Sequence, residues 1–325
     1  MPSSTPHAAR LLRGLAAACA LLISAGPARA EWPDKPVHLV VPYAAGGGVD
    51  NVARIVAPPL AARLGQPVII DNRPGANANI GSEFVAKAPP DGYTFLVGAT
   101  FLAANRASMP GLGYDAQRDL APVARLGRSP ALLVVSASLP VRSVRELADY
   151  AKAHKNEASY ASVGSASPNS LIFVRNTGIP AVQVLYKGGA QAMPDLIAGR
   201  VMFMVTTVSE ALAHVQSGKL RALAVTGNDR IKALPEVPTM AQAGVPDLTA
   251  VGWWGVLAPA HAPAAASDRL SAALAEVLRQ PAVVTAMDGL GIEAAPLDVP
   301  GFTRFYAAEM QFYTEAARAF DLRPK

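Results

Sequence analysis

The chain has 325 residues with a formal net charge of +5, and 51% of the residues are hydrophobic. Cys19 is the only cysteine, so a disulfide-stabilised scaffold is excluded and stability must come from a sizeable core. The length suits one large or two medium domains. After residue 30, no apolar stretch is long enough to span a bilayer without interruption.

The first thirty residues have the pattern of a secretory signal peptide. Arg10 and Arg13 precede Leu15–Ala25, which is apolar but too short to cross a bilayer, and Ala28-Arg29-Ala30 fits the small-x-small cleavage pattern. We therefore expect export with cleavage after Ala30. The alternatives are an uncleaved anchor and a lipoprotein anchored at Cys19, which follows a poor lipoprotein signal.

Removal of this segment takes three arginines away, so 26 basic and 24 acidic side chains remain. The high computed isoelectric point therefore comes largely from the signal segment. A near-neutral surface offers no electrostatic basis for binding nucleic acid, and we expect no nucleic-acid partner.

The first strand, turn and helix are predicted between residues 37 and 64. Val37–Val41 is a short apolar run rich in β-branched residues, which is typical of a buried parallel strand. Small residues follow at Ala44–Gly48, and Asp50 or Asn51 can cap the helix. Such a turn directs unpaired backbone N–H groups and the positive end of a helix dipole at one point, so a small anion can bind there.

Two more strands continue this alternating pattern. Pro67–Asp71 and Tyr93–Gly98 are predicted strands, separated by a turn-rich loop and a short helix at Ile80–Lys87. Alternation of strands and helices predicts a parallel sheet, in which ligands bind beyond the carboxyl ends of the strands. The glycine turn and Thr100 both follow strands, so they are expected along that edge.

The second half of the chain repeats the order. Two apolar segments, Leu120–Leu126 and Ala131–Ser136, flank Gly127–Pro130, which we interpret as the first crossing into a second domain; Val251–Ala258 is interpreted as the return. The predicted strands between them are Ser159–Val163, Val182–Tyr186, Val201–Val205 and Leu220–Thr226. The predicted helices are Val144–Ala153 with Ser143 as its cap, 168–177, Ala190–Ala198, Glu210–Gln216 and Met240–Ala243. The C-terminal part has three predicted helices and no strong strand: Ala264–Leu278, Pro281–Leu290 and Val299–Phe320.

A second turn rich in glycine and serine spans Ser162–Asn169, at the end of a predicted strand. Pro168 stands where a helix can begin. This turn therefore has the same place in a strand–turn–helix unit as the first turn. We predict that the two turns face each other and hold one carboxylate between two helix N-termini.

Other chemistries lack their motifs. Gly46-Gly47-Gly48 is not the GxGxxG fingerprint of dinucleotide-binding proteins, and Ser165 is not in the GxSxG context of a nucleophile elbow. Four histidines are isolated and have no metal-ligand spacing: His38, His154, His214 and His261. The sequence thus offers little support for an enzyme, a cofactor site or a metal site, and a tight turn without a ligand is the simplest alternative to an anion-binding turn.

Three further side chains have two interpretations each. Trp253 either packs in the core or forms a wall or lid against the ligand. Arg73 either pairs with a carboxylate or is solvated in a polar loop. Lys187 precedes a Gly-Gly turn at a strand end, so it lies either near the ligand or at the surface.

Eight stretches, in order, resemble a known family. They are VPYAAGGGVDNVAR (Val41–Arg54), VIIDNRPGANANIG (Val68–Gly81), PPDGYTFLVG (Pro89–Gly98), YASVGSASPNSL (Tyr160–Leu171), VLYKGGAQAMPDLIAGRV (Val184–Val201), SGKLRALAVTG (Ser217–Gly227), LPEVPTMAQAGVPDL (Leu234–Leu248) and GWWGVLAPAHAP (Gly252–Pro263). The chain resembles the Bug-type extracytoplasmic solute receptors, the binding subunits of tripartite tricarboxylate transporters, over its whole length.

This resemblance implies an α/β periplasmic binding protein of type II, with two lobes and a ligand cleft between them. Lobe 1 would comprise residues 31–128 and 251–325, and lobe 2 would comprise residues 129–250. The implied function is to capture a small carboxylate, such as a di- or tricarboxylate, by hinge closure. The receptor would then deliver it to membrane transporter subunits, and we expect it to act as a monomer.

Carried over onto this sequence, the ligand contacts fall on both lobes. Those of lobe 1 are Tyr43, Ala45, Gly46, Gly47 and Thr100. Those of lobe 2 are Ser162, Gly164, Ser165, Ala166, Asn169, Lys187 and Gly188. Specificity for the rest of the ligand is expected from Tyr43, Phe101, Asn169 and Trp253.

The chain also departs from the family pattern. The family often has His where Asn169 stands and commonly has Asp at the positions of Met202 and Thr206. If those carboxylates serve an ammonium group, their loss favours an acid without an amine. Two alternative functions remain: a secreted hydrolase that uses Ser165 and a distant His, and a periplasmic sensor subunit that presents its ligand to a signalling protein.

Overall fold

The structure is a computed structural model that describes residues 32–163, 168–186, 189–246, 248 and 251–320. The chain divides into two compact units, Met1–Asp34 and Lys35–Lys325, and every described helix and strand belongs to the second. The predicted signal peptide and its cleavage site lie outside the described residues.

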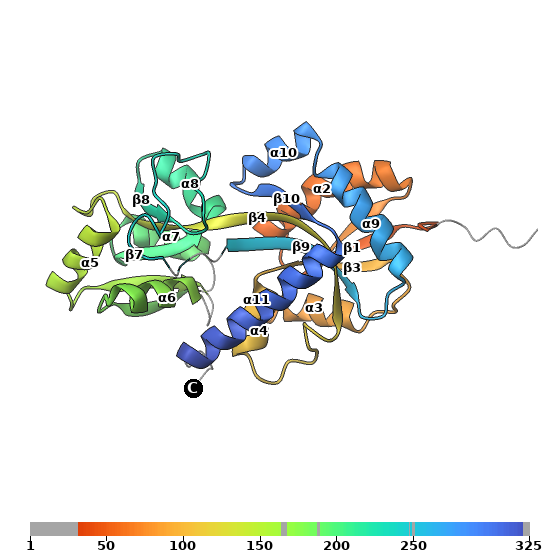
Figure 1. The fold of residues 1–325 in the computed structure, drawn as a ribbon, viewed down its shortest axis with the longest axis horizontal. Coiled ribbons are helices and arrows are strands. Elements are labelled where there is room, and N and C mark those ends of the chain that lie inside the picture. The colour runs from red at the N-terminus through yellow and green to blue at the C-terminus, as the bar shows by residue number, and fades with distance from the viewer. Residues whose placement is uncertain (1–31, 164–167, 187–188, 247, 249–250, 321–325) are drawn as a thin grey trace, which may run out of the picture. The chain divides into compact units, whose positions relative to one another are not determined.

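The second unit alternates strands and helices through most of its length (Figure 1). Its strands are β1 (Val37–Val41), β2 (Val68–Asn72), β3 (Thr94–Ala99), β4 (Leu120–Ser136), β5 (Ser159–Val163), β6 (Val182–Tyr186), β7 (Phe203–Thr207), β8 (Leu220–Val225), β9 (Val251–Pro259) and β10 (Glu293–Leu297). Its helices are α2 (Gly48–Leu64), α3 (Asn79–Ala86), α4 (Phe101–Ser108), α5 (Val144–Ala153), α6 (Pro168–Thr177), α7 (Gly189–Ile197), α8 (Val208–Gln216), α9 (Ala264–Val277), α10 (Pro281–Asp288) and α11 (Val299–Phe320).

The described strands form one sheet in the order β2-β1-β3-β9-β4-β7-β5-β6, with β8 and β10 paired to β4 outside this path. β1 is parallel to β2 and β3, and β5 is parallel to β6 and β7. β4 joins the two groups, because it pairs with β9 as far as Pro130 and with β7 from Ala131 onward. Figure 1 shows β4 and β9 running between the two groups. We call the group with β1–β3 lobe 1 and the group with β5–β8 lobe 2.

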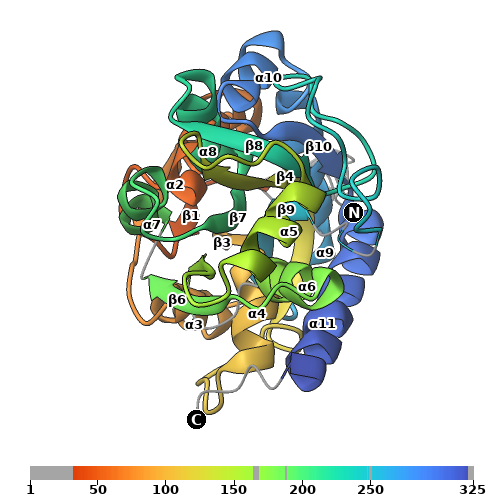
Figure 2. The ribbon, with the colours of Figure 1, turned by 90° about the vertical axis from the view of Figure 1, so that its left-hand side faces the viewer.

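Lobe 2 has helices on both faces of its strands. Side chains alternate along a strand, so neighbouring residues of β4 face opposite sides of the sheet. Leu133 and Val135 are buried with side chains of α5 and α6, whereas Leu132 and Val134 are buried with side chains of α7 and α8. Figure 2 shows these four helices around strands β6, β7 and β8.

Lobe 1 has its core under the long helix α11. Phe302, Tyr306 and Met310 recur at helical spacing on α11 and pack with Leu102 of α4 and Trp253 of β9. Helices α2 and α9 contact each other and contact β2 and β4, respectively. The core of lobe 1 therefore contains side chains of the first strands together with side chains of the C-terminal helix α11.

Most predicted elements are present, and Val299–Phe320 is a helix with the predicted bounds. Gly127–Pro130, interpreted as a crossing between domains, do not interrupt a strand, since β4 is continuous through them. Pro130 lies where the pairing partner changes from β9 to β7, so its missing N–H removes little of the ladder.

Two predictions are wrong, and one helix was not predicted. The C-terminal part does contain a strand, β10, whose sequence Glu293–Leu297 is short and alanine-rich but pairs with β4. The helix α4 was not predicted; in the structure it follows Thr100, whose side chain does not cap it. Met240–Ala243 forms a turn rather than a helix, in which Gln242 N–H donates to Thr239 Oγ1 at 3.2 Å.

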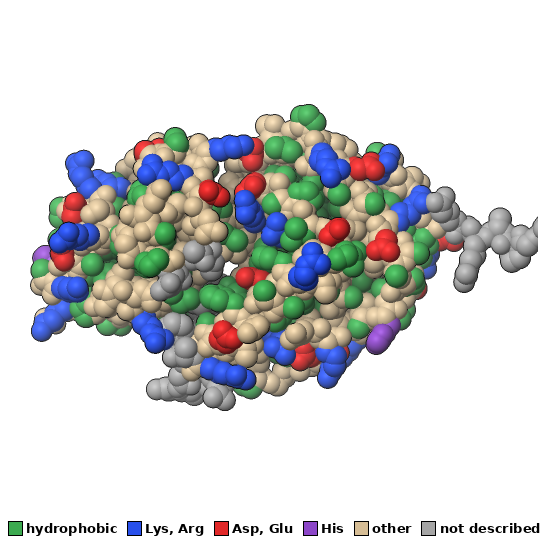
Figure 3. Space-filling view, in the orientation of Figure 1, with side chains coloured by type: hydrophobic (Ala, Val, Ile, Leu, Met, Phe, Trp, Pro, Cys, Tyr) green, Lys and Arg blue, Asp and Glu red, His purple; other side chains and the backbone are tan. Residues whose placement is uncertain are grey.

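No helix in the described part of the chain combines the length and the apolar composition that a membrane span requires. On the face drawn in Figure 3, Lys and Arg side chains are spread among Asp and Glu side chains rather than gathered in one patch. On this face, the distribution agrees with the near-neutral charge predicted for the exported chain.

Candidate functional site

The register of β4 places strand ends from both lobes near one region. Ala99, the last residue of β3, pairs with Trp254 of β9, which in turn pairs with Gly127 of β4. Thr207, the last residue of β7, pairs with Ala131 of β4. β3 runs in the direction of β4 and β7 runs against it, so their carboxyl ends point towards each other. At about 3.3 Å per residue, the two ends lie about 13 Å apart along β4.

The two predicted turns follow strands that share these directions. β1 is parallel to β3, so the loop after Val41 follows a carboxyl end of lobe 1. β5 is parallel to β7, so the loop after Val163 follows a carboxyl end of lobe 2. Thr100 directly follows β3. The strand ends that precede both predicted groups of ligand residues are therefore directed towards the crossing strands.

Asp50 shapes the first turn. Residues 44–48, which include Ala45, are exposed, and Gly46 has a φ of 87°, a conformation that glycine adopts at little cost. Gly47 is the N-cap of α2 and no side chain caps it, so the predicted capping by Asp50 or Asn51 is wrong. Asp50 lies inside the first helical turn instead, and its Oδ2 accepts the Gly46 N–H at 2.7 Å.

The Asp50 carboxylate is fully buried. Its Oδ2 accepts a hydrogen bond from Arg54 Nε at 2.7 Å, and its Oδ1 accepts one from Asn72 Nδ2 at 2.9 Å. Burial alone would raise the pKa of Asp50, but hydrogen bonds from Arg54, Gly46 and Asn72 outweigh it, and the pKa is lowered. Because the Gly46 amide is bonded within the protein, the first-turn amides of α2, which have no intrahelical acceptor, are the donors left for an anion.

Tyr43 lies beside this turn and contacts the start of α4. Its ring centroid is 5.4 Å from that of Phe101, with an interplanar angle of 84°. Its carbonyl oxygen accepts a hydrogen bond from Asn72 Nδ2 at 3.0 Å. Burial, with a smaller contribution from Tyr114, raises the pKa of Tyr43 to about 12, so its phenol is a neutral hydrogen-bond donor at pH 7. Since Phe101 follows Thr100, this contact brings two predicted ligand residues into one neighbourhood.

Thr100 is bonded to the crossing strand β9. Trp253 N–H donates to Thr100 Oγ1 at 3.2 Å, and Trp253 Nε1–H donates to Glu309 Oε2 at 3.1 Å. The indole is fully buried and meets Phe302 and Tyr306 edge to face, with centroids 5.5 and 5.8 Å away. Of the two interpretations of Trp253, the structure therefore shows core packing and not an exposed wall or lid.

The described residues around the second turn carry buried polar atoms without partners. Ser162 and Ser170 are buried, and in the described part of the chain Ser162 Oγ, Asn169 Oδ1 and Ser170 Oγ have no hydrogen-bond partner. A buried polar atom left unbonded costs free energy, so three of them around one turn indicate a missing polar partner. The remaining predicted residues of lobe 2 lie outside the described residues: Gly164, Ser165, Ala166, Lys187 and Gly188.

Arg73 has partners within lobe 1. Its Nε donates to Asp71 Oδ2 at 2.7 Å, and its guanidinium carbon is 3.6 Å from the ring centroid of Phe84. The Arg73 guanidinium therefore interacts with Asp71 and Phe84 rather than with solvent alone, and neither of these residues belongs to the glycine turn. Over the residues that the structure describes, no group of three His, Cys, Asp or Glu side chains could hold a metal ion.

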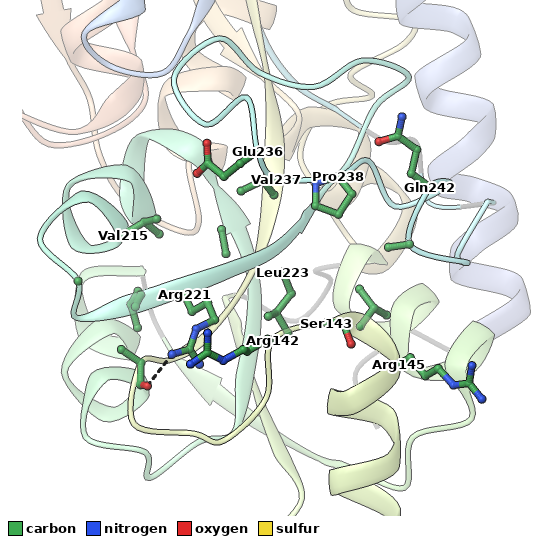
Figure 4. Close-up of a pocket in the computed structure, with 16 residues that line it drawn as sticks. Arg142, Ser143, Arg145, Val215, Arg221, Leu223, Glu236, Val237, Pro238 and Gln242 are labelled. Atoms are coloured by element: carbon green, nitrogen blue, oxygen red, sulfur yellow. Dashed lines mark hydrogen bonds between the residues drawn. The ribbon is translucent and has the colours of Figure 1, made fainter.

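A pocket of about 670 Å³ lies elsewhere in lobe 2, between the start of α5, β8 and residues 236–243 (Figure 4). Three arginines line it, but Arg221 donates to the carbonyl oxygens of Ala137, Leu139 and Val141 at 3.0, 3.0 and 2.8 Å. Arg221 thus holds the loop after β4. None of the predicted ligand residues that the structure describes lines this pocket.

The sequence analysis did not predict the roles of two acidic residues near the site. Asp50 bonds the Gly46 amide and so fixes the first turn, and Glu309 bonds the Trp253 indole. A signal for Glu309 was present in the sequence, because it falls in the apolar stripe that Phe302, Tyr306 and Tyr313 form on α11. A single acidic residue on the apolar face of a helix indicates either a buried carboxyl group or a place where that face is exposed to solvent.

Comparison with known proteins finds one matching family. Residues 52–316 match the tripartite tricarboxylate transporter family receptor. Protein BugT of Bordetella pertussis (strain Tohama I) is 35% identical over 302 residues, which cover 90% of this chain and 92% of BugT.

Solved structures give the same result. R. palustris Rpa4515 with adipate is 34% identical, has a TM-score of 0.80 and is matched over 88% of this chain and 97% of that one. The periplasmic binding protein BugD is 29% identical, has a TM-score of 0.79 and is matched over 90% of this chain and 100% of its own. The fold is thus that of a periplasmic binding protein with two α/β lobes, as predicted.

Proposed function

Because this chain belongs to the tripartite tricarboxylate transporter receptor family, a family of solute-binding receptors and not of enzymes, we propose that it captures a small organic acid between its two lobes. The receptor acts in the periplasm after cleavage of the signal peptide. It closes around the acid by movement at β4 and β9, and it delivers the acid to membrane transporter subunits as a monomer.

One observation carries the proposal: the carboxyl ends of β3 and β7 point towards each other across four residues of β4. Ligands of open α/β sheets bind beyond such ends. With two sets of ends opposed, one ligand can contact both lobes, and its binding energy then favours the closed arrangement. The division into lobe 1 (31–128 and 251–325) and lobe 2 (129–250) follows from the same crossing.

In lobe 1, we assign the carboxylate to the exposed turn before α2 and to Thr100. The first-turn amides of α2 donate to it, and the attraction of the helix dipole adds roughly 0.3–1 kcal/mol. Gly46 contributes through its left-handed backbone rather than its amide, which Asp50 already accepts. Tyr43 and Phe101 form an aromatic edge beside the turn and contact the rest of the ligand.

In lobe 2, the unbonded hydroxyl groups of Ser162 and Ser170 are the partners of the acid. Ser162 Oγ and Ser170 Oγ can donate hydrogen bonds, and the Asn169 side chain can donate from its amide nitrogen. Residues 164–166, Lys187 and Gly188 complete this side in the proposal. Backbone and hydroxyl donors contact only the carboxylate and make no contact with the rest of the ligand. The same binding site can therefore bind different acids.

The ligand class is an acid without an amine. The position of Met202, which is commonly Asp in the family, holds a side chain buried in the core of lobe 2. Thr206 Oγ1 donates to Glu210 Oε2 and so has a partner inside the protein. Neither residue offers a free carboxylate to an ammonium group. Rpa4515 is described with adipate, a dicarboxylate, so adipate is the first acid to test.

The test is a thermal-shift screen of the exported chain with mono-, di- and tricarboxylates and amino acids. A bound acid raises the melting temperature by mass action, by RT ln(1 + [L]/Kd) in free energy. Adipate or another amine-free acid is expected to raise it, and glutamate is expected to have little effect. No shift with any acid would contradict the receptor function, and a shift with amino acids alone would contradict the ligand class.

A further inference from the structure

The pocket of about 670 Å³ in lobe 2 lies away from the proposed ligand site. Arg221 of β8, which lines the pocket, pairs with Val135 of β4. Thr207, where β7 ends beside the ligand site, pairs with Ala131 of the same strand. The two partners are four residues apart on β4, which corresponds to about 13 Å. The residues that line the pocket all belong to lobe 2, so movement at the crossing strands does not separate them.

The charged side chains of this pocket lack oppositely charged partners. Among the residues that the structure describes, Arg142, Arg221 and Glu236 form no ion pair. Figure 4 shows the guanidinium groups of Arg142 and Arg221 at one end of the pocket and the Glu236 carboxylate at the other. Three of the five N–H donors of Arg221 bond to carbonyl oxygens, so two remain for a carboxylate.

Apolar side chains that line the pocket are buried, whereas two of its charged residues are exposed. The buried ones are Val144, Leu220, Leu223 and Val237. An apolar centre with a polar, solvent-accessible rim is the usual anatomy of a surface that binds another protein. A small-molecule site instead encloses most of its ligand. The exposure of Arg142 and Glu236 therefore favours a segment of a protein over a free small molecule.

A lipid surface fits this pocket less well than a protein segment does. Anionic membranes attract clusters of basic side chains, and the Glu236 carboxylate on the rim would be repelled by the same headgroups. A protein segment can present an acidic side chain to Arg142 and Arg221 and an apolar side chain to the buried centre. Its backbone N–H groups or a basic side chain can bond to Glu236. The two ends of the pocket therefore match a segment that carries an acidic residue.

We propose that this pocket docks an acidic segment of a membrane transporter subunit onto lobe 2. This inference rests on the proposed function, in which the receptor delivers its acid to such a subunit. A carboxylate of the segment pairs with Arg142 and Arg221, and a neighbouring apolar side chain covers the buried centre of the pocket. Because the pocket lies about 13 Å along β4 from the ligand edge, docking there needs no contact with the bound acid.

The experiment uses Arg142→Glu, which reverses one charge and keeps the backbone N–H that donates to Glu146 Oε2. In the bacterium that encodes this chain, the gene is replaced by the wild type or the variant, and uptake of labelled adipate is measured. Uptake at low adipate concentration is expected to fall about tenfold, because like charges then meet at the interface. The adipate Kd of the purified variant should equal that of the wild type. An Asp or Glu to Lys substitution in a periplasmic loop of the transporter subunit should restore uptake.

Lys152→Glu is the matched control, because Lys152 is exposed on the same helix and does not line the pocket. It should leave uptake unchanged. Normal uptake with Arg142→Glu, an equal loss with Lys152→Glu, or no restoring substitution would overturn the inference and leave acid binding intact. Two other results would also overturn it: binding to protein-free vesicles of the cell's lipids that Arg142→Glu abolishes, and a second adipate per chain that this variant loses. If no acid binds in the thermal-shift screen, the receptor function itself fails.

Discussion

At the scale of single residues, the candidate site contains two kinds of buried polar group. Asp50 is buried, and its carboxylate accepts hydrogen bonds from Arg54, Asn72 and the Gly46 amide. Ser162 is equally buried, but its hydroxyl has no partner among the described residues. A satisfied group stabilises the turn that it shapes, whereas an unsatisfied one costs stability until a ligand bonds to it.

Asp50→Asn is expected to lower the free energy of unfolding at pH 7 by about 1–3 kcal/mol, because hydrogen bonds to a buried charge are lost. The folded-state pKa of Asp50 is lowered, so its contribution is present above the unfolded pKa of about 4 and is lost as the pH falls below it. The loss should therefore be smaller at about pH 3. Denaturant unfolding of the wild type and the variant at both pH values measures this loss of free energy. Asp149→Asn, at an exposed position, is the control. Equal losses at the two pH values would contradict this account.

Ser162→Ala is expected to have opposite effects on stability and on binding. Removing a buried, unbonded hydroxyl should raise the free energy of unfolding of the ligand-free protein by about 1 kcal/mol. Losing a hydrogen bond to a carboxylate should weaken acid binding about tenfold. Unfolding and calorimetric titration with the same acid check both. Ser217→Ala, at an exposed position, should change neither quantity. A less stable variant with unchanged affinity would show that Ser162 is structural.

At the scale of elements, α3 approaches the first turn closely because Gly81 has no side chain. A Cβ atom at Gly81 would lie 2.9 Å from the Arg73 carbonyl oxygen and 2.9 Å from Pro42. Pro42 precedes Tyr43, so the position of the aromatic edge depends on how closely α3 packs. The sequence offers no sign of this requirement, because the contact joins residues about forty positions apart.

Gly81→Ala is expected to destabilise the protein by about 1–3 kcal/mol, because backbone atoms must move to admit the methyl group. It should also weaken acid binding by displacing Tyr43. Gly48→Ala is the matched substitution, since a Cβ there meets nothing within 4 Å, and it should leave stability unchanged or slightly raised. Thermal unfolding compares the two. Equal behaviour of the two variants would argue against close packing at Gly81.

At the scale of the whole molecule, β4 and β9 connect the two lobes. The helix α11 contacts α4 of lobe 1 and α6 of lobe 2. Binding of an acid between the lobes should draw them together, because contacts to the acid from both sides form only in the closed arrangement. Figure 1 shows the crossing strands about which this movement would occur.

Small-angle scattering should therefore show a smaller radius of gyration when a saturating acid is added. The change should follow the binding curve, since closure is driven by contacts to the ligand. Glutamate at the same concentration serves as the control for ionic effects. An unchanged radius at saturation would contradict hinge closure, although it would leave acid binding itself in place.

Much of the fold could be predicted because local patterns set it. The apolar run Val37–Val41 and the periodic stripe of Val299–Phe320 carry their structure in their own residues, and both were predicted with their observed bounds. β10 could not be predicted, since Glu293–Leu297 has weak strand character and becomes a strand only by pairing with β4.

Some features of the candidate site could also be predicted from the sequence, and others depend on the tertiary structure. The sequence alone identified the family, the glycine turn before α2 and the order of strands that puts ligand residues beyond carboxyl ends, because these depend on residue type and local spacing. Only the tertiary structure decided that Asp50 accepts the Gly46 amide, that Trp253 is buried and that Glu309 is bonded to it. Burial and hydrogen-bond partners depend on contacts between distant residues, and such contacts exist only once the sheet and α11 have come together.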